Sequence, residues 1–237
     1  SGDLAKKKIF PALFALYLEN SLPKHFMIYG FSRTKMTNEE FRKSISSYLT
    51  CRVFVNDTKT CEEKMDQFLS RCHYQYGDYD SKTDYIRLNT IMNKKEHKYE
   101  EANRVYFFSV PSTLFRVVAH NSIKYACSQK GYNRVVVEKP FGRDSESSRI
   151  LSNELLEVMK EDDIYRIDHY LGKELIDNLT VLRFSNIVFQ PLWSRQYIKN
   201  VQILFSEPFG TEGRGKYFDN YGIIRDIMQN HLLQMMA

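Results

Sequence analysis

Short apolar runs recur along the first part of the chain, separated by longer segments with helical periodicity. The runs fall at 26–30, 104–110 and 134–138, and a fourth ends near Tyr165. Runs that are apolar at nearly every position are typical of parallel strands covered on both faces. Because strands alternate with helices up to about residue 165, the pattern predicts an α/β fold with a parallel sheet.

Helical segments fill the gaps between these runs. The first reaches about Glu19, and Pro11 within it predicts a kink. Its apolar face has i, i+3, i+4, i+7 spacing and consists of Phe10, Leu13, Phe14 and Tyr17. A capping box from Thr37 to Glu40 opens a second helix. Further helices are expected at 61–72, 81–93, 112–127 and 145–160.

The pattern changes near residue 175, where we place a domain boundary. A helix continues over 179–184, but 201–205 alternates apolar and polar positions with a period of two. That alternation is typical of a half-exposed strand in an antiparallel sheet. A glycine-rich connection at 207–215 follows, and the last helix carries His231.

Composition and charge narrow the possible partners. A hydrophobic content of 43% in 237 residues is typical of a folded globular protein. The formal net charge of +5 suits anionic metabolites but is too weak to indicate nucleic acid. No apolar run approaches the roughly 20 residues of a membrane span, so no membrane partner is expected. The chain starts abruptly at Ser1 and stops inside an apolar helix at Ala237, so we expect a longer protein.

The four cysteines have no spacing that assigns them a role. Cys51, Cys61, Cys72 and Cys127 form neither a C-x-x-C motif nor the dense framework of a secreted domain. We therefore expect reduced thiols in a cytoplasmic protein. No histidine–cysteine group has the spacing of zinc ligands, and no metal site is expected.

The densest chemistry lies in the stretch Arg-Ile-Asp-His-Tyr-Leu-Gly-Lys-Glu at 166–174. It follows a predicted strand, at the position where open α/β sheets bind ligands. Asp168 paired with His231 would make a carboxylate-oriented general base. The polar, partly cationic cradle beside this pair would consist of His169, Tyr170 and Lys173. Together these groups predict a site for a phosphorylated substrate that bears hydroxyl groups.

Two further features suit a dinucleotide. Gly2 opens the first helix, whose N-terminus could bind a phosphate, although taken alone this feature favours an ordinary capped helix. Segment 32–34 contains Arg33 and no acid, which favours the 2′-phosphate of NADP over the free ribose of NAD. A surface arginine is the alternative. Lys139 precedes Pro140 at a strand end, which keeps its backbone extended and can aim its ammonium across a cleft.

Taken singly, several of these residues also have an ordinary structural explanation. His231 is compatible with a buried helix residue, Asp226 with a polar helix face, and Glu207 with a solvated strand edge. Only their combination favours a site.

Five motifs in order carry a resemblance to a known family. They are Ser-Gly-Asp-Leu-Ala-Lys-Lys-Lys at 1–8, Glu-Lys-Pro-Phe-Gly at 138–142, the stretch at 166–174, Glu-Pro-Phe-Gly-Thr-Glu-Gly-Arg-Gly at 207–215 and Asp-Ile-Met-Gln-Asn-His-Leu-Leu-Gln at 226–234. Together they resemble the glucose-6-phosphate dehydrogenase family, and the nine-residue stretch at 166–174 is very specific to it. The resemblance runs nearly end to end but covers only the N-terminal half of that family's length.

The resemblance implies an architecture. Residues 1–174 would form an NADP-binding domain with a Rossmann-like parallel sheet whose first strand is apparently missing. Residues 175–237 would begin a truncated α+β substrate and dimerisation domain with an antiparallel sheet. A homodimer or homotetramer would form through the missing C-terminal half.

The resemblance also implies a reaction: oxidation of D-glucose 6-phosphate at C1 to 6-phosphogluconolactone, with NADP⁺ taking the hydride. His231 would be the base and Asp168 its orienting partner. The substrate residues would be Lys139, His169, Tyr170, Lys173, Glu207 and Asp226. The cofactor residues would be Ser1, Gly2, Asp3, Leu4, Ala5, Lys6, Arg33, Phe115 and Lys139. Phe115 departs from familiar members, which have a tyrosine there. Another NADP-dependent sugar oxidoreductase and a non-catalytic NADP-binding fragment remain the alternatives.

Overall fold

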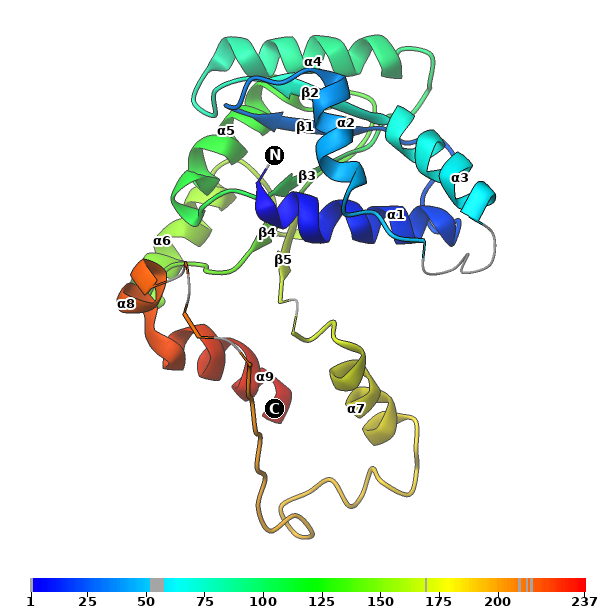
Figure 1. Ribbon diagram of the computed structural model, residues 1–237. Coiled ribbons are helices and arrows are strands. Elements are labelled where there is room, and N and C mark those ends of the chain that lie inside the picture. The colour runs from blue at the N-terminus through cyan, green and yellow to red at the C-terminus, as the bar shows by residue number, and fades with distance from the viewer. Residues whose placement is uncertain (1, 52–57, 169, 209, 212, 214) are drawn as a thin grey trace. The chain divides into compact units, whose positions relative to one another are not determined.

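The chain divides into two units, each held together by its own contacts (Figure 1). Unit 1 comprises Ser1–Val137 and Asn153–Tyr165, and unit 2 comprises Glu138–Ser152 and Arg166–Ala237. This computed structural model describes residues 2–51, 58–168, 170–208, 210–211, 213 and 215–237.

Two parallel sheets organise the strands. In the first, β1 (Ile28–Ser32) pairs in parallel with β2 (Cys72–Tyr76). In the second, the order is β3 (Arg104–Phe108), β4 (Asn133–Glu138) and β5 (Ile164–Ile167), with β3 and β4 parallel. Parallel pairing requires crossovers, and helices supply them. The predicted Rossmann-like α/β class is therefore confirmed, and the described residues contain no strand that joins the two sheets.

Helices alternate with these strands in the order that the apolar pattern predicts. They are η1 (Ala5–Ile9), α1 (Phe10–Leu18), α2 (Asn38–Ser46), α3 (Thr58–Ser70), α4 (Lys82–Glu96), η2 (Ser112–Leu114), α5 (Phe115–Ala126), α6 (Ser145–Leu156) and η3 (Glu161–Asp163). The predicted capping box is present at the start of α2, where the amide of Glu40 donates to Thr37 Oγ1 at 3.2 Å. The amide of Thr37 donates to Glu40 Oε2 at 2.7 Å in return.

The hydrophobic core of unit 1 lies between α1, α2, α3 and the first sheet. Phe14, Phe41 and Phe68 are fully buried in it, and each such ring contributes about 1.5–3 kcal/mol by leaving water. The rings of Phe10 and Phe41 meet edge to face at 5.5 Å. The i, i+3, i+4 pattern of the first helix is thus explained by packing.

Several predicted elements differ from the observed ones. Cys72–Tyr76 is a strand, although the prediction ended a helix at Cys72. Only Cys72 and Tyr74 of this strand are buried, so it shows no long apolar run. The π-helical segment η1 runs directly into α1, with Ile9 and Phe10 both helical, so Pro11 lies inside a continuous helix rather than at a free N-terminus. The proline thus directly follows a change from π-helical to α-helical hydrogen bonding.

The cysteines require a correction. Cys51 and Cys61 form a disulfide, with their Cα atoms 6.0 Å apart, whereas reduced thiols were expected throughout. A separation of 10 residues matches no motif, so only the fold brings the two together. Cys72 and Cys127 are free.

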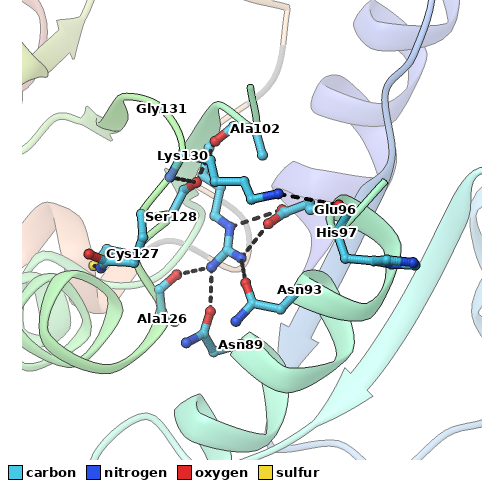
Figure 2. A network of polar contacts seen from close by, with 12 residues as sticks. Asn89, Asn93, Glu96, His97, Ala102, Ala126, Cys127, Ser128, Lys130 and Gly131 are labelled. Carbon is cyan, nitrogen blue, oxygen red and sulfur yellow. Dashed lines mark hydrogen bonds and ion pairs between the residues drawn. The ribbon is translucent and has the colours of Figure 1, made fainter. Parts of the chain in front are cut away.

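Figure 2 shows Asn89, Asn93 and Glu96 of α4 in one polar network with Ala126, and the buried side chain that joins them is Arg104 of β3. The side chain of Arg104 is 5% exposed, and its guanidinium donates to both carboxylate oxygens of Glu96, at 2.6 and 3.0 Å. It also donates to Asn93 at 2.6 Å, to Asn89 at 2.7 Å and to the carbonyl of Ala126. All five N–H groups of this side chain thus have partners.

Unit 2 contains α7 (Glu174–Phe184), α8 (Gly215–Ile223), η4 (Ile224–Leu232) and α9 (Leu233–Met236). The strand predicted at 201–205 is not formed in the part of the chain that the structure describes. Leu204 is 94% exposed there, so no partner strand covers it. A single strand without neighbours is not stable in water, which explains the difference. No described helix has the length and apolarity needed to cross a membrane.

Candidate active site

The candidate base and its carboxylate meet within unit 2. Asp168 directly follows β5, and His231 lies 63 residues later on the π-helical segment η4. The Nδ1 atom of His231 is 2.7 Å from Asp168 Oδ1 and 3.0 Å from Oδ2. This distance is that of a strong, charge-assisted hydrogen bond. The bond fixes the ring orientation and leaves Nε2 as the basic nitrogen.

The environment of His231 keeps it neutral. Burial is the main influence and lowers the pKa of the imidazole below 6.5, while the hydrogen bond to Asp168 raises it. The nearby ammonium of Lys139 adds to the lowering. Because the net shift is downward, His231 is unprotonated near neutral pH and can accept a proton.

Tyr170 links this pair to a lysine. Its ring stacks on the imidazole of His231 with centroids 3.9 Å apart and an interplanar angle of 21°. The ammonium of Lys173 lies 3.7 Å from the centroid of the same tyrosine ring. The ring of Tyr170 thus contacts both the imidazole of His231 and the ammonium of Lys173. His231 has 0% exposure, so a ligand reaches its imidazole only when covering side chains such as Tyr170 move.

Lys139 and Asp226 form a second polar pair in unit 2. Lys139 Nζ donates to the main-chain carbonyl of Asp226 at 2.9 Å and to its Oδ1 at 3.3 Å. Their side chains are 16% and 6% exposed. The Lys139–Pro140 peptide bond is cis, which the sequence allowed without requiring. Attraction between the two charges is strong at this burial, because little water screens them.

A cavity of about 310 Å³ opens beside these groups. Its lining includes Glu138, Lys139, Tyr170, Glu207, Tyr217 and Asp226. The volume falls within the range of roughly 300–1,000 Å³ that small-molecule sites occupy. Burial raises the pKa of Glu138 above its ordinary value, which marks an acidic group in a poorly hydrated position.

The structure therefore brings together, within unit 2, seven residues predicted for the site. They are Lys139, Asp168, Tyr170, Lys173, Glu207, Asp226 and His231. The predicted His169 lies outside the described residues. Sequence reasoning missed Glu138 and Tyr217, although Glu138 stands within the Glu-Lys-Pro-Phe-Gly motif.

The predicted cofactor residues belong to unit 1, apart from Lys139. Gly2, Asp3, Leu4, Ala5 and Lys6 begin the first helix, where the amide of Lys6 donates to the carbonyl of Gly2 at 3.1 Å. The first amides of that helix have no helical acceptor and suit a phosphate. Ser1 lies outside the described residues.

The remaining two cofactor residues differ in accessibility. Arg33 is exposed directly after β1, and its guanidinium lies 5.3 Å from the centroid of the Tyr79 ring. Phe115 is only 2% exposed and packs against Phe108 with ring centroids 6.0 Å apart. Its ring is therefore part of the core of unit 1 in this conformation.

No metal site is apparent in the described part of the chain, where no three His, Cys, Asp or Glu side chains gather suitably. Two features together define a class of protein: a parallel α/β fold whose first helix follows a glycine, and a helical histidine bound by a carboxylate at a strand end. These are features of dinucleotide-dependent oxidoreductases.

Comparison with known proteins identifies the family. Residues 1–178 match the family model described as "Glucose-6-phosphate dehydrogenase, NAD binding domain". Residues 180–237 match "Glucose-6-phosphate dehydrogenase, C-terminal domain". The chain belongs to the glucose-6-phosphate dehydrogenase family, as the motifs predicted, and its N-terminal part is a nicotinamide-dinucleotide-binding domain of that family.

Individual relatives agree. The chain is 59% identical to "Glucose-6-phosphate 1-dehydrogenase, chloroplastic" of Spinacia oleracea, over all of this chain and 41% of that protein. It is 48% identical to "Glucose-6-phosphate 1-dehydrogenase" of Aspergillus niger, over 46% of that protein. A solved structure described as "Glucose-6-phosphate dehydrogenase in complex with its substrate glucose-6-phosphate" superimposes with a TM-score of 0.91 at 43% identity. It covers 99% of this chain and 48% of the solved one.

These relatives overturn one prediction. A cytoplasmic location was expected, but the spinach relative and a 58% identical relative from Arabidopsis thaliana are both named as chloroplastic. The expected cytoplasmic location rested on the absence of a disulfide pattern among the cysteines. The structure corrects that premise, because Cys51 and Cys61 form a disulfide. The chain spans less than half the length of these relatives.

Proposed function

We propose that the whole protein to which this chain belongs oxidises D-glucose 6-phosphate at C1 to 6-phosphogluconolactone and reduces NADP⁺. This is the first step of the oxidative pentose phosphate pathway. The observation that carries the proposal is the 2.7 Å contact between His231 and Asp168, beside a cavity of sugar-binding size in a member of this family. The chloroplastic relatives favour a plastid location.

His231 performs the proton transfer. Its Nε2 removes the proton of the C1 hydroxyl, and Asp168 stabilises the imidazolium that results. As the C1–O bond gains double-bond character, the hydrogen on C1 leaves with its electron pair. NADP⁺, when bound, supplies the nicotinamide ring that accepts this hydride. The lowered pKa of His231 keeps the base available at neutral pH.

The other residues hold the substrate. Lys173 binds the phosphate as a point charge, with His169 and Tyr170 as further donors. Asp226 and Glu207 accept hydrogen bonds from sugar hydroxyls, and both line the cavity. For this to occur the ring of Tyr170 has to swing away from His231, because the imidazole has no exposed surface.

The cofactor would be NADP, held by residues of unit 1 and by Lys139. The residues present fit it: the free amides at the start of the first helix suit the pyrophosphate, and exposed Arg33 suits a 2′-phosphate. We also propose that the domain boundary lies between residues 174 and 175. The complete protein forms a homodimer or homotetramer through residues beyond this chain.

The test uses the full-length protein. We expect NADPH absorbance to appear when glucose 6-phosphate and NADP⁺ are added, and His231→Asn to abolish turnover while the substrate still binds. His120→Asn, on the exposed face of α5, is the matched control and should retain full activity. Turnover by His231→Asn at the wild-type rate would refute the assigned base.

A second variant separates the proposal from another sugar oxidoreductase. Lys173→Ala should raise the KM for glucose 6-phosphate far more than the KM for NADP⁺, since the lysine serves the phosphate. Lys199→Ala removes an exposed ammonium from the same unit and should change neither constant. Equal small changes in both constants for Lys173→Ala would favour the alternative. No NADPH formation by the complete protein would favour a non-catalytic NADP-binding role.

A further inference from the structure

Tyr217 contacts an acid of the proposed site. This tyrosine lies on α8 and lines the 310 Å³ cavity. Its hydroxyl donates to Asp226 Oδ1 at 3.0 Å, and Asp226 is only 4% exposed. A buried carboxylate depends on its donors, because each replaces water that burial has removed.

Two different donors converge on the same oxygen. Lys139 Nζ reaches Oδ1 at 3.3 Å and the Asp226 carbonyl at 2.9 Å, while the phenol reaches Oδ1 from another element. An ammonium on a flexible four-carbon stem gives charge but little orientation. A phenol has only two side-chain torsions and a directional O–H. The tyrosine is therefore the donor that fixes the plane of the Asp226 carboxylate.

Tyr217 is itself held in place. Its ring stacks on that of Tyr221, one helical turn later, with centroids 4.7 Å apart and an interplanar angle of 17°. Such stacking between neighbouring turns restricts the tyrosine rotamer and hence the position of its hydroxyl.

The contact exists only because the helix breaks. In a continuous helix, residues nine positions apart lie roughly two and a half turns and about 13 Å apart, on opposite faces. Gly222, inside the last turn of α8, has φ 69° and ψ 165°, a conformation that other residues rarely adopt, and it interrupts the helix between Tyr217 and Asp226. The chain therefore folds back and places residue 217 against residue 226.

We propose that Tyr217 is a positioning residue that orients the Asp226 carboxylate toward one hydroxyl of the sugar. This inference rests on the proposed function, in which Asp226 binds the sugar. Tyr217 transfers no proton to the reacting atoms. It acts by holding one carboxylate oxygen so that the carboxylate presents a fixed acceptor geometry to the substrate.

The test is Tyr217→Phe in the full-length protein, which removes the hydroxyl and keeps the ring. We expect the KM for glucose 6-phosphate to rise about ten- to hundredfold, as for loss of one hydrogen bond to a charged group. The KM for NADP⁺ should stay within twofold. Tyr221→Phe is the control, since it keeps the stacked ring and should leave both constants unchanged.

Two further measurements exclude a merely structural role. Wild-type protein should discriminate against the one deoxyglucose 6-phosphate that lacks the hydroxyl bound by Asp226, and Tyr217→Phe should lose most of that discrimination. In an Asp226→Ala background, which removes the acceptor of the Tyr217 hydroxyl, Tyr217→Phe should change the substrate KM by less than twofold.

The outcomes are distinguishable from those for the proposed function. Suppose that the wild-type protein turns over glucose 6-phosphate, and that Tyr217→Phe has the wild-type KM and the wild-type analogue preference. That result would overturn the inference about Tyr217 and leave the proposed function standing. A fall in melting temperature with all kinetic constants unchanged would overturn the inference too. Absence of wild-type turnover would overturn the proposed function first.

Discussion

Replacing Asp168 with asparagine tests the central geometry most directly. The carboxylate accepts from His231 Nδ1 at 2.7 Å, and an asparagine of the same shape can present an N–H₂ group there instead. The imidazole would then accept at Nδ1 and carry its proton on Nε2. In that tautomer the nitrogen that should take the substrate proton is already occupied.

The expected loss of activity follows from the hydrogen bond between His231 and Asp168. A hydrogen bond to a charged group contributes about 1.5–3 kcal/mol, which corresponds to roughly ten- to hundredfold in rate if it is lost only in the transition state. The wrong tautomer adds to this, and in a serine protease the equivalent change costs about 10⁴ in kcat. We therefore expect Asp168→Asn to lower kcat by about 10²–10⁴-fold, with a smaller effect on KM.

The pH dependence of activity gives an independent test, because the direction in which it shifts can be predicted. The base acts when unprotonated, so activity falls as pH drops through the pKa of His231, which burial lowers below 6.5. The hydrogen bond to Asp168 raises that pKa. Its loss in Asp168→Asn should therefore move the acid limb of kcat/KM to lower pH while the plateau falls.

The assay is NADPH formation by the full-length protein over a range of pH. Asp177→Asn removes an exposed carboxylate from α7 and should leave both plateau and limb unchanged. An Asp168→Asn enzyme with a wild-type plateau, or an acid limb displaced to higher pH, would refute the proposed pairing.

Three further predictions concern other features. Arg104→Lys should lower the free energy of unfolding by about 3–5 kcal/mol in urea titrations, because it leaves the carboxylate of Glu96 without its paired donors. Exposed Arg116→Lys should change it by less than about 0.5 kcal/mol, and an equal effect of both would refute the role of the network. Gly222→Ala should lower the free energy of unfolding by about 1–3 kcal/mol through backbone strain alone, because an added Cβ meets no atom within 4 Å. A melting temperature equal to that of the wild type would contradict this prediction. Arg33→Ala should raise the KM for NADP⁺ at least tenfold and leave that for NAD⁺ little changed, and loss of affinity for both cofactors alike would argue against a 2′-phosphate contact.

The parallel strands were predictable because most positions in their runs are apolar, although they are not fully buried: Val105 in β3 is 58% exposed. The run at 134–138 places Val135 and Val137 at 0% exposure, and such positions have no tolerance for polar residues. Strand β2 was not predictable in this way, because Cys-His-Tyr-Gln-Tyr buries only two of its five residues. The predicted strand at 201–205 failed for a different reason: its alternation is real, but among the residues that the structure describes no strand pairs with it.

The site was predictable where motifs are local. The stretch at 166–174 identified Asp168, and its pairing with His231 followed from the need of a base for an orienting carboxylate. Tyr217 was missed because its contact with Asp226 spans a helix break. A spacing of nine residues indicates no contact in a regular helix, and the π-helical turns near it have no simple sequence signature.

The full set of partners around Arg104 bears on how this part of the protein opens. Release of α4 breaks the bonds of the Arg104 guanidinium to Asn89, Asn93 and Glu96 together and leaves it joined only to the carbonyl of Ala126 at the end of α5. Partial fraying is therefore costly there, and opening becomes a collective event. In hydrogen–deuterium exchange, the amides of α4 should lose protection together, as one cooperative unit.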